Sequence, residues 1–261
     1  MTHITDMFRL DGNVALVSGG AGLYGRHICR ALAEAGAHVV IASRDLDACD
    51  AAAATLVADG LAATATRLDQ GDADSISEAC DTVTAELGGI DILINNAVYR
   101  RGGAMLTVES DDLRATAEVN YVGLMQITRR VAEQMVERGG GSIVNVASIY
   151  GVVGPQFAVY EGTDIVSPAF YAFEKGGMIN LTRHLAAYYG PSGIRVNCVS
   201  PGGLATPDQP ESFVAAYSQR TPLGRLAGPD DIKGPIVFLS SPAASYVNGV
   251  NLMVDGGWTA V

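Results

Sequence analysis

Short apolar runs alternate with longer amphipathic segments along the whole chain. The runs, such as residues 13–17 and 38–42, are flanked by turn-forming residues, which is typical of strands buried on both faces of a parallel sheet. The longer segments carry apolar side chains at helical spacing, as expected for helices that cover such a sheet. We predict strands over residues 13–17, 38–42, 63–68, 90–94, 142–146, 194–199 and 251–254. We predict helices over residues 26–35, 46–59, 74–87, 111–138, 169–189, 211–219 and 230–239.

This alternation of strands and helices predicts the fold class. A strand, a helix and a second strand in succession form a right-handed unit with parallel strands. We therefore expect an α/β fold of the doubly wound Rossmann type, a three-layer sandwich with a mostly parallel sheet of about seven strands. No repeat or low-complexity linker divides the chain, so we expect residues 1–261 to form a single domain. Residues 149–168 lack a periodic pattern and are predicted to form an inserted loop.

Charge and cysteine content narrow the range of partners. The formal net charge is −11, so nucleic acid and anionic membrane surfaces would repel the protein. No segment reaches the ~18 apolar residues of a membrane span, and the N-terminal segment lacks the pattern of a signal peptide. The four cysteines are scattered without metal-ligand spacing, which favours reduced thiols and no metal site. We expect a cytoplasmic protein whose partners are small molecules.

A glycine-rich segment, residues 18–25, joins the first predicted strand to the first predicted helix. Glycine allows a positive φ, a close approach of the backbone to a pyrophosphate, and close packing of strand and helix. The helix N-terminus then offers free N–H groups and the positive end of its dipole to phosphates. This setting predicts a dinucleotide-binding turn with Gly19, Gly22 and Gly25 as its glycines.

The tip of the second predicted strand bears on the choice of dinucleotide. An acidic residue there would bind a ribose 2′-hydroxyl and repel a 2′-phosphate, whereas this chain has Ser43 and Arg44. A hydroxyl and a guanidinium suit a phosphate, so the tip favours NADP(H), with NAD(H) as the alternative. Arg44 could instead be a solvated turn residue paired with Asp45 or Asp47.

Tyr171 and Lys175 stand four residues apart at the start of a predicted helix and therefore share one of its faces. A free phenol has a pKa near ~10 and is a weak acid–base catalyst at neutral pH. A fixed positive charge beside it favours the phenolate and lowers that pKa. An isolated pair at this spacing is common, so the other motifs decide its significance.

In order and spacing, the motifs resemble those of the short-chain dehydrogenase/reductase family, and the match covers nearly the whole chain. Each motif is weak alone, but the set is specific. The matching pieces are residues 18–25, Asp69, Asn95-Asn96-Ala97, Asn120, Ser148, Tyr171, Lys175, Pro201-Gly202, Thr206 and the terminal residues 254–258.

The resemblance implies catalytic roles for Asn120, Ser148, Tyr171 and Lys175. Tyr171 would be the general acid in reduction and the base in oxidation, and Ser148 would hold the substrate oxygen beside it. Lys175 would hold the nicotinamide ribose and lower the pKa of Tyr171, while Asn120 would anchor a water in a proton relay. Asn120 could instead brace the backbone of its long helix, and Ser148 could be a turn residue.

The resemblance also implies a set of cofactor contacts. Asp69 would reach the adenine edge, and Asn96 and Ala97 would line the adenosine ribose. The implied cofactor-binding residues are Ser18, Gly19, Gly22, Leu23, Gly25, Ser43, Arg44, Asp69, Asn96, Ala97, Tyr171, Lys175, Pro201, Gly202, Leu204 and Thr206, the last four at the nicotinamide end.

The chain departs from the family pattern in two turns. Leu23 stands where the middle glycine is usual, and the preceding Gly22 replaces a residue that is often basic in NADP-using members, which weakens the case for NADP(H). Val98 replaces the glycine of the usual Asn-Asn-Ala-Gly, and Arg100 and Arg101 follow closely. These arginines could meet an anionic or sugar-like substrate, or form an exposed basic loop, which is the commoner case.

The segment between Ser148 and Tyr171 is longer than usual in the family, since the two residues are 23 positions apart. Its hydroxyl, amide and carboxylate side chains suit a polyhydroxylated substrate better than a long acyl chain, although the loop could instead pack against a neighbouring subunit. We therefore expect an NAD(P)(H)-dependent oxidoreductase that interconverts a secondary alcohol and a ketone, on a sugar or polyol. The alternatives are a 3-oxoacyl-carrier-protein or general carbonyl reductase, and a non-catalytic cofactor sensor. By the same resemblance we expect a homo-oligomer, a tetramer or a dimer.

Overall fold

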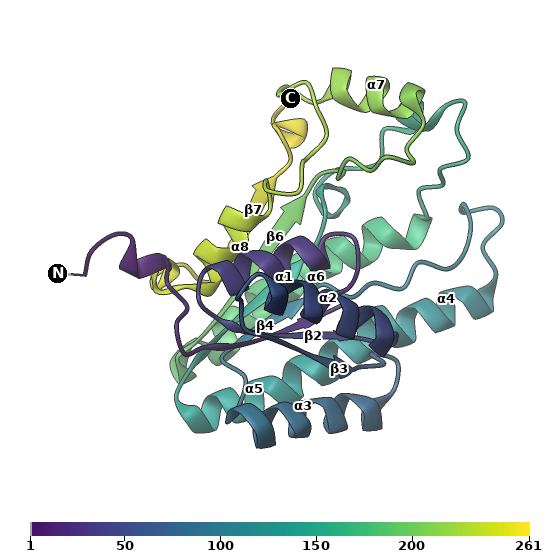
Figure 1. Ribbon diagram of the computed structural model, residues 1–261. Coiled ribbons are helices and arrows are strands. Elements are labelled where there is room, and N and C mark those ends of the chain that lie inside the picture. Colours follow the sequence, from purple (N-terminus) through teal and green to yellow (C-terminus); the bar gives the residue numbers. More distant parts are fainter. Residues whose placement is uncertain (1) are drawn as a thin grey trace.

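The computed structural model describes residues 2–261, which are built around one seven-stranded sheet (Figure 1). The strand order is β3-β2-β1-β4-β5-β6-β7, and every neighbouring pair is parallel. The strands are β1 (Val14–Ser18), β2 (His38–Ser43), β3 (Ala63–Arg67), β4 (Ile92–Asn95), β5 (Gly141–Val146), β6 (Ile194–Pro201) and β7 (Asn251–Val254). The predicted fold class is confirmed. Because the strand order reverses between β1 and β4, the carboxyl ends of these strands open a crevice.

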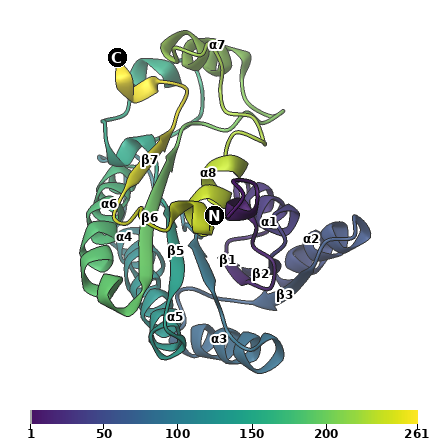
Figure 2. The ribbon, with the colours of Figure 1, turned by 90° about the vertical axis from the view of Figure 1, so that its left-hand side faces the viewer.

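Helices cover both faces of the sheet (Figure 2). One face carries α1 (Gly25–Glu34), α2 (Leu46–Ala58) and α8 (Lys233–Ser240), and the other carries α3 (Ala73–Leu87), α5 (Leu124–Arg138) and α6 (Ala169–Tyr189). Successive strand residues point to opposite faces, so Val17 packs in the first core with Ile28 of α1, whereas Leu16 packs in the second core with Ile127 of α5. This explains why the strands read as continuous apolar runs.

The helix predicted over residues 111–138 is interrupted. It consists of α4 (Ser110–Ala117), a π-helical turn (Glu118–Gly123) and α5. A Cβ on Gly123 would lie 1.7 Å from the Gln70 carbonyl oxygen, so the helix passes very close to this loop. The Gln70 side chain also donates to the Val119 carbonyl at 2.9 Å, which supplies a partner for a carbonyl in the turn. Both contacts come from a segment distant in sequence.

A smaller lobe stands above the sheet (Figure 2). It contains the inserted loop with two 3₁₀ turns (Ile149–Gly151 and Phe157–Tyr160), the helix α7 (Glu211–Arg220) and the C-terminal 3₁₀ turn (Trp258–Ala260). Its own apolar cluster includes Val159, Phe213, Tyr217 and Trp258. Within residues 2–261, no helix combines the length and apolar character needed to cross a membrane, and no cluster of His, Cys, Asp and Glu could hold a metal ion.

Candidate active site

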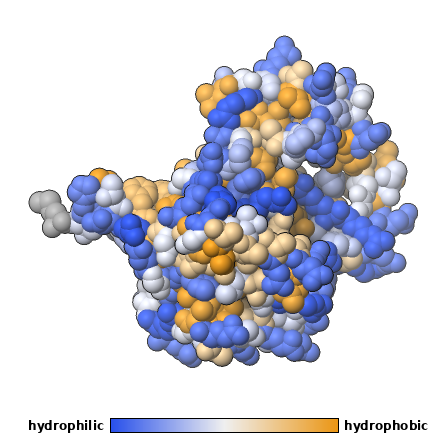
Figure 3. All heavy atoms as spheres, viewed as in Figure 1, coloured by the Kyte–Doolittle hydropathy of each residue, from blue (hydrophilic) through white to orange (hydrophobic). Residues whose placement is uncertain are grey.

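A pocket of about 510 Å³ opens at the carboxyl ends of the central strands. Its walls include Gly19 after β1, Asn96 after β4, Ser148 after β5 and Gly202 after β6. In the surface view of Figure 3, the hollow lies between the body that holds the sheet and the lobe that carries α7. The predicted site residues that line this pocket are Gly19, Gly22, Leu23, Asn96, Ala97, Ser148, Tyr171, Lys175, Pro201, Gly202 and Leu204.

The glycine turn fits a pyrophosphate. Gly19 has φ +64°, and a Cβ on Gly25 would lie 2.1 Å from the Gly19 carbonyl oxygen, so both positions exclude larger residues. Within residues 2–261, the N–H groups of Leu23 and Tyr24 have no backbone acceptor, and they lie at the N-terminus of α1. Among the same residues positive φ values occur only at glycines, so Leu23 occupies the usual place of a glycine without strain.

Ser18 supports the pocket from below and does not line it. Its hydroxyl is fully buried and accepts from the backbone N–H groups of Asn96 and Ala97 at 3.2 and 3.1 Å. The Asn96 side chain donates in return to the Ser18 and Gly19 carbonyls at 3.1 and 2.9 Å. These bonds fasten the ends of β1 and β4 together, so the crevice between them keeps its shape.

At the tip of β2, Arg44 is exposed and its guanidinium carbon lies 5.5 Å from the centroid of the Tyr99 ring. The Asp45 carboxylate accepts the Ala48 N–H and caps α2. Within residues 2–261, Arg44 forms an ion pair with neither Asp45 nor Asp47, although it is an exposed residue of this turn as that alternative expected. The Ser43 hydroxyl donates to the Asp45 carbonyl at 3.0 Å.

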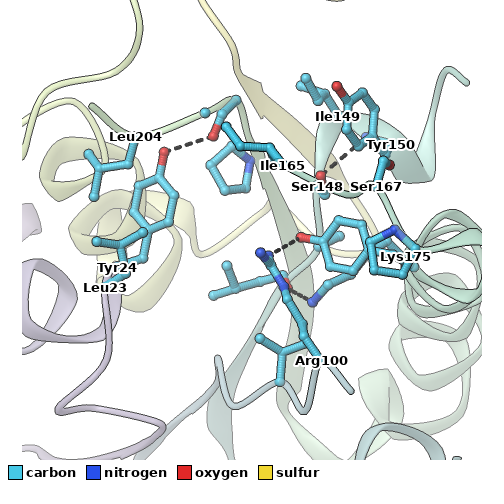
Figure 4. Close-up of a pocket in the computed structure, with 18 of the residues that line it drawn as sticks. Leu23, Tyr24, Arg100, Ser148, Ile149, Tyr150, Ile165, Ser167, Lys175 and Leu204 are labelled. Atoms are coloured by element: carbon cyan, nitrogen blue, oxygen red, sulfur yellow. Dashed lines mark hydrogen bonds between the residues drawn. The ribbon is translucent and has the colours of Figure 1, made fainter. Parts of the chain in front are cut away.

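Six of the implied cofactor residues lie outside the pocket wall, namely Ser18, Gly25, Ser43, Arg44, Asp69 and Thr206. The Asp69 carboxylate accepts the Gly71 N–H at 3.0 Å, and Thr206 accompanies Gln209, whose side chain accepts the Thr206 N–H at 3.0 Å. The sequence did not reveal a contact between the start of α1 and the turn after β6. There the Tyr24 hydroxyl donates to the Gly202 carbonyl at 2.9 Å (Figure 4).

Tyr171 and Lys175 project from the first two turns of α6 into the pocket. Lys175 is 4% exposed, and its ammonium donates to the Val146 carbonyl at 2.7 Å (Figure 4). The same ammonium lies 5.7 Å from the centroid of the Tyr171 ring. The end of β5 therefore fixes the lysine, and the helix spacing places its charge beside the phenol, as the sequence predicted.

Opposing influences act on the pKa of Tyr171. Burial alone would raise it, but the positive charges of Lys175 and Arg100 and the hydrogen bond with Ser148 outweigh burial, so the pKa lies below its usual value. Burial lowers the pKa of the Lys175 ammonium, and the neighbouring Arg100 charge lowers it further. The Ser148 hydroxyl accepts the Tyr150 N–H at 3.2 Å, and its own proton is directed to the Tyr171 oxygen, where it favours the phenolate.

Asn120 lies in the π-helical turn, and its side chain is fully engaged with protein groups. Its carbonyl oxygen accepts the Tyr99 N–H at 2.7 Å, and its amide donates to the Tyr99 carbonyl at 2.8 Å and to Glu174 at 2.9 Å. Asn120 therefore braces the backbone of a neighbouring segment, whereas the alternative drawn from the sequence had it brace its own helix. The braced segment is the one that carries Tyr99 and the two arginines.

The adjacent arginines take opposite directions. Arg100 lies in the pocket, donates to the Tyr171 hydroxyl at 2.8 Å and has its guanidinium carbon 4.5 Å from the centroid of that ring (Figure 4). Arg101 is exposed and pairs with Asp112 at 3.2 Å. Sequence reasoning treated the two alike. The replacement of a glycine by Val98 was the only signal that this turn follows an unusual path.

The inserted loop forms the far wall of the pocket and packs on α7 of the same chain. The hydroxyls of Tyr150 and Tyr160 are hydrogen-bonded to each other at 2.5 Å. The Tyr160 ring stacks on the Phe213 ring, with 5.7 Å between the ring centroids. Further aromatic stacking reaches the C-terminal segment, where the Tyr217 and Trp258 rings stack with 4.4 Å between their centroids. Tyr150, Tyr160 and Ser167 place hydroxyl-bearing side chains on this wall.

Comparison with known proteins places the chain among oxidoreductases. The family model described as "Enoyl-(Acyl carrier protein) reductase" matches residues 22–259. D-threitol dehydrogenase of Mycolicibacterium smegmatis is 36% identical, over 97% of this chain and 95% of that protein. Galactitol 2-dehydrogenase (L-tagatose-forming) of Cereibacter sphaeroides is 37% identical, over 97% of both chains. The crystal structure of a gluconate 5-dehydrogenase from Burkholderia cenocepacia, in complex with NADP and tartrate, is 34% identical with a TM-score of 0.90, over 99% of this chain and 100% of that one.

Proposed function

The chain belongs to the short-chain dehydrogenase/reductase family, and we propose that it interconverts a secondary alcohol of a polyol or sugar acid and the corresponding ketone, with NADP(H) as its preferred cofactor. The observation that carries the proposal is the convergence of Ser148, Tyr171 and Lys175 in one pocket beside a glycine turn with no room for larger residues. The relatives are enzymes, so the alternative of a non-catalytic sensor has no support from them.

Proton transfer falls to Tyr171. In oxidation the phenolate takes the proton of the substrate hydroxyl, and in reduction the phenol gives it to the carbonyl oxygen. The positive charges of Lys175 and Arg100 stabilise the phenolate, and the Ser148 hydroxyl, which here hydrogen-bonds Tyr171, would donate its proton to a substrate oxygen bound beside that phenol. The nicotinamide, when bound, supplies the redox chemistry by accepting or giving a hydride.

Different parts of the pocket would hold different parts of the cofactor. The glycine turn and the free N–H groups of Leu23 and Tyr24 would hold the pyrophosphate, and Arg44 would meet a 2′-phosphate. Lys175 and the Pro201-Gly202 turn would hold the nicotinamide end. We assign Asn120 a positioning role, because its side chain holds the backbone of Tyr99.

The polyol proposal rests on the pocket wall and on the relatives. The wall opposite the strand ends carries the hydroxyl-bearing Tyr150, Tyr160 and Ser167, and such side chains suit a substrate with several hydroxyls. Two relatives that align with nearly the whole chain are dehydrogenases of threitol and galactitol, and a solved structure with the same fold is a gluconate 5-dehydrogenase.

A cofactor-linked absorbance assay tests the proposal. The purified protein should reduce NADP⁺ with alditols or aldonates faster than it oxidises NADPH with acyl thioesters, and the reverse preference would favour the carrier-protein reductase. Tyr171→Phe should lower kcat by about 10²- to 10⁴-fold while NADPH still binds, because only the acid–base group is removed. Tyr188→Phe, an exposed tyrosine of the same helix, is the matched control. Wild-type turnover by Tyr171→Phe would refute the mechanism.

We propose that the protein is a homo-oligomer, a dimer or a tetramer. Tyr121 and Met125 are one helical turn apart and both exposed, and Phe173 at the start of α6 is 84% exposed. A contiguous patch of such side chains would mark a subunit contact, and the family resemblance carries the same expectation. Light scattering coupled to size-exclusion chromatography should give a mass of two or four chains, and a monomer at micromolar concentration would contradict the proposal.

A further inference from the structure

The charges around the catalytic pocket are unbalanced. The residues that line the pocket include two cationic side chains, Arg100 and Lys175, and no aspartate or glutamate. This is unexpected in a protein with a formal net charge of −11. An electropositive pocket in an acidic protein attracts anionic groups, the cofactor's phosphates among them.

The two cations differ in what remains available for a ligand. The Lys175 ammonium is 4% exposed and donates to the Val146 carbonyl. Arg100 donates one N–H, to the Tyr171 hydroxyl, and within residues 2–261 no carboxylate lies within ion-pair distance of its guanidinium. Its neighbour Arg101 has such a partner in Asp112. Arg100 therefore has unused donors at the point where the substrate reacts.

We propose that Arg100 binds a carboxylate of the substrate, so that this enzyme acts on hydroxy acids in preference to neutral alditols. The inference rests on the proposed function and names the substrate class within it. A guanidinium presents a planar fork of two N–H groups that matches the two oxygens of one carboxylate. Because Arg100 also contacts the Tyr171 hydroxyl, a carboxylate bound to it lies near the reacting carbinol.

Matched substrates test this inference. We compare D-gluconate with D-glucitol, and threonate with threitol, in each of which a carboxylate replaces a terminal hydroxymethyl group. The wild-type enzyme should show a kcat/KM about 10- to 100-fold higher for the carboxylate of a pair, the range expected for charged hydrogen bonds. Arg100→Gln should bring this ratio close to one, Arg100→Lys should retain part of it, and Arg101→Gln should leave it unchanged.

The outcomes separate two roles of Arg100. If Arg100→Gln lowers kcat/KM equally for both members of a pair, Arg100 acts only on Tyr171 and the inference is wrong. A wild-type preference for the alditol, or for a sugar phosphate such as glucose 6-phosphate, also overturns it. A circular dichroism spectrum and thermal transition like those of the wild type show that Arg100→Gln is folded.

Binding without turnover separates this inference from the proposed function. The NADPH-loaded enzyme cannot oxidise an alcohol, so calorimetry with gluconate and glucitol measures binding alone. Gluconate should bind the wild type and lose affinity in Arg100→Gln by a similar 10- to 100-fold, about as expected for a charged hydrogen bond. If the wild type oxidises neither alcohol, the proposed function fails, while an Arg100-dependent affinity for gluconate still supports the carboxylate site. If gluconate binds both proteins equally, the carboxylate site is absent.

Discussion

The two ends of the pocket are built in different ways. At the cofactor end, backbone atoms and buried hydrogen bonds define the shape: Gly19 and Gly25 have no room for a Cβ, and Ser18 and Asn96 fasten β1 to β4. At the substrate end, side chains from distant segments define it, above all Arg100 and Tyr160. A site made from backbone allows few substitutions, whereas one made from loop side chains can change its ligand while the fold is kept.

The largest effect is expected at the cofactor end, with Gly25→Val. A side chain there would overlap the Gly19 carbonyl oxygen, so we expect a loss of about 3 kcal/mol or more in the free energy of unfolding and loss of NADPH binding. Urea denaturation and a fluorescence titration with NADPH measure the two quantities. Gly234→Ala in α8, where a Cβ meets nothing within 4 Å, is the control: it should keep NADPH affinity and raise the free energy of unfolding by about 0.5–1 kcal/mol, because alanine favours a helix. Wild-type affinity in Gly25→Val would mean that backbone closeness does not define this end.

Arg44→Asp tests a side chain at the cofactor end, whose shape is otherwise set by backbone atoms. The question is whether Arg44 decides between NADP⁺ and NAD⁺. An anion in place of the guanidinium would repel a 2′-phosphate, so the ratio of kcat/KM for NADP⁺ over NAD⁺ should fall by about 10- to 100-fold. Steady-state kinetics with both cofactors measure this ratio. Arg44→Lys keeps the charge and should keep most of the preference. An unchanged ratio in Arg44→Asp would show that Arg44 does not meet the phosphate.

The pH profile tests the substrate end. Burial raises the pKa of Tyr171, while Lys175, Arg100 and Ser148 together lower it below its usual value. Removing the Arg100 charge in Arg100→Gln should therefore raise this pKa. Oxidation needs the phenolate, so the acidic limb of kcat/KM against pH should move to higher pH. Reduction needs the phenol, so activity should persist to higher pH. Arg101→Gln should keep the wild-type profile, and an unmoved limb in Arg100→Gln would show that its charge does not act on the phenol.

The smallest effect is expected in the wall of the substrate end. Tyr160→Phe removes the hydrogen bond with Tyr150 and keeps the ring on Phe213, so the free energy of unfolding should fall by about 1 kcal/mol. The KM for the polyol should rise while the KM for NADP⁺ stays the same. Thermal denaturation and steady-state kinetics measure these changes, with the fully exposed Tyr246→Phe as the control. An equal rise in both KM values would argue that the two ends are not independent.

Much of the fold, the glycine turn and the pair of acid–base residues could be predicted from local sequence. The strands and α6 lie close to the predicted bounds, because buried parallel strands are continuously apolar and Pro168 precedes the helix. The shared direction of Tyr171 and Lys175 was also predictable, because residues four apart lie on one face of a helix. The π-helical turn was not, because it depends on contacts between Gly123 and Gln70, which are distant in sequence.

By itself, the sequence determined the sheet, the glycine turn and the pair of acid–base residues, because each follows from spacing along a single element. Only the tertiary structure decided what surrounds them. Arg100 and Arg101 are neighbours with the same chemistry, yet the first meets Tyr171 and the second meets Asp112. Asn120 holds the Tyr99 backbone immediately before them, and such contacts between distant segments exist only in the folded chain.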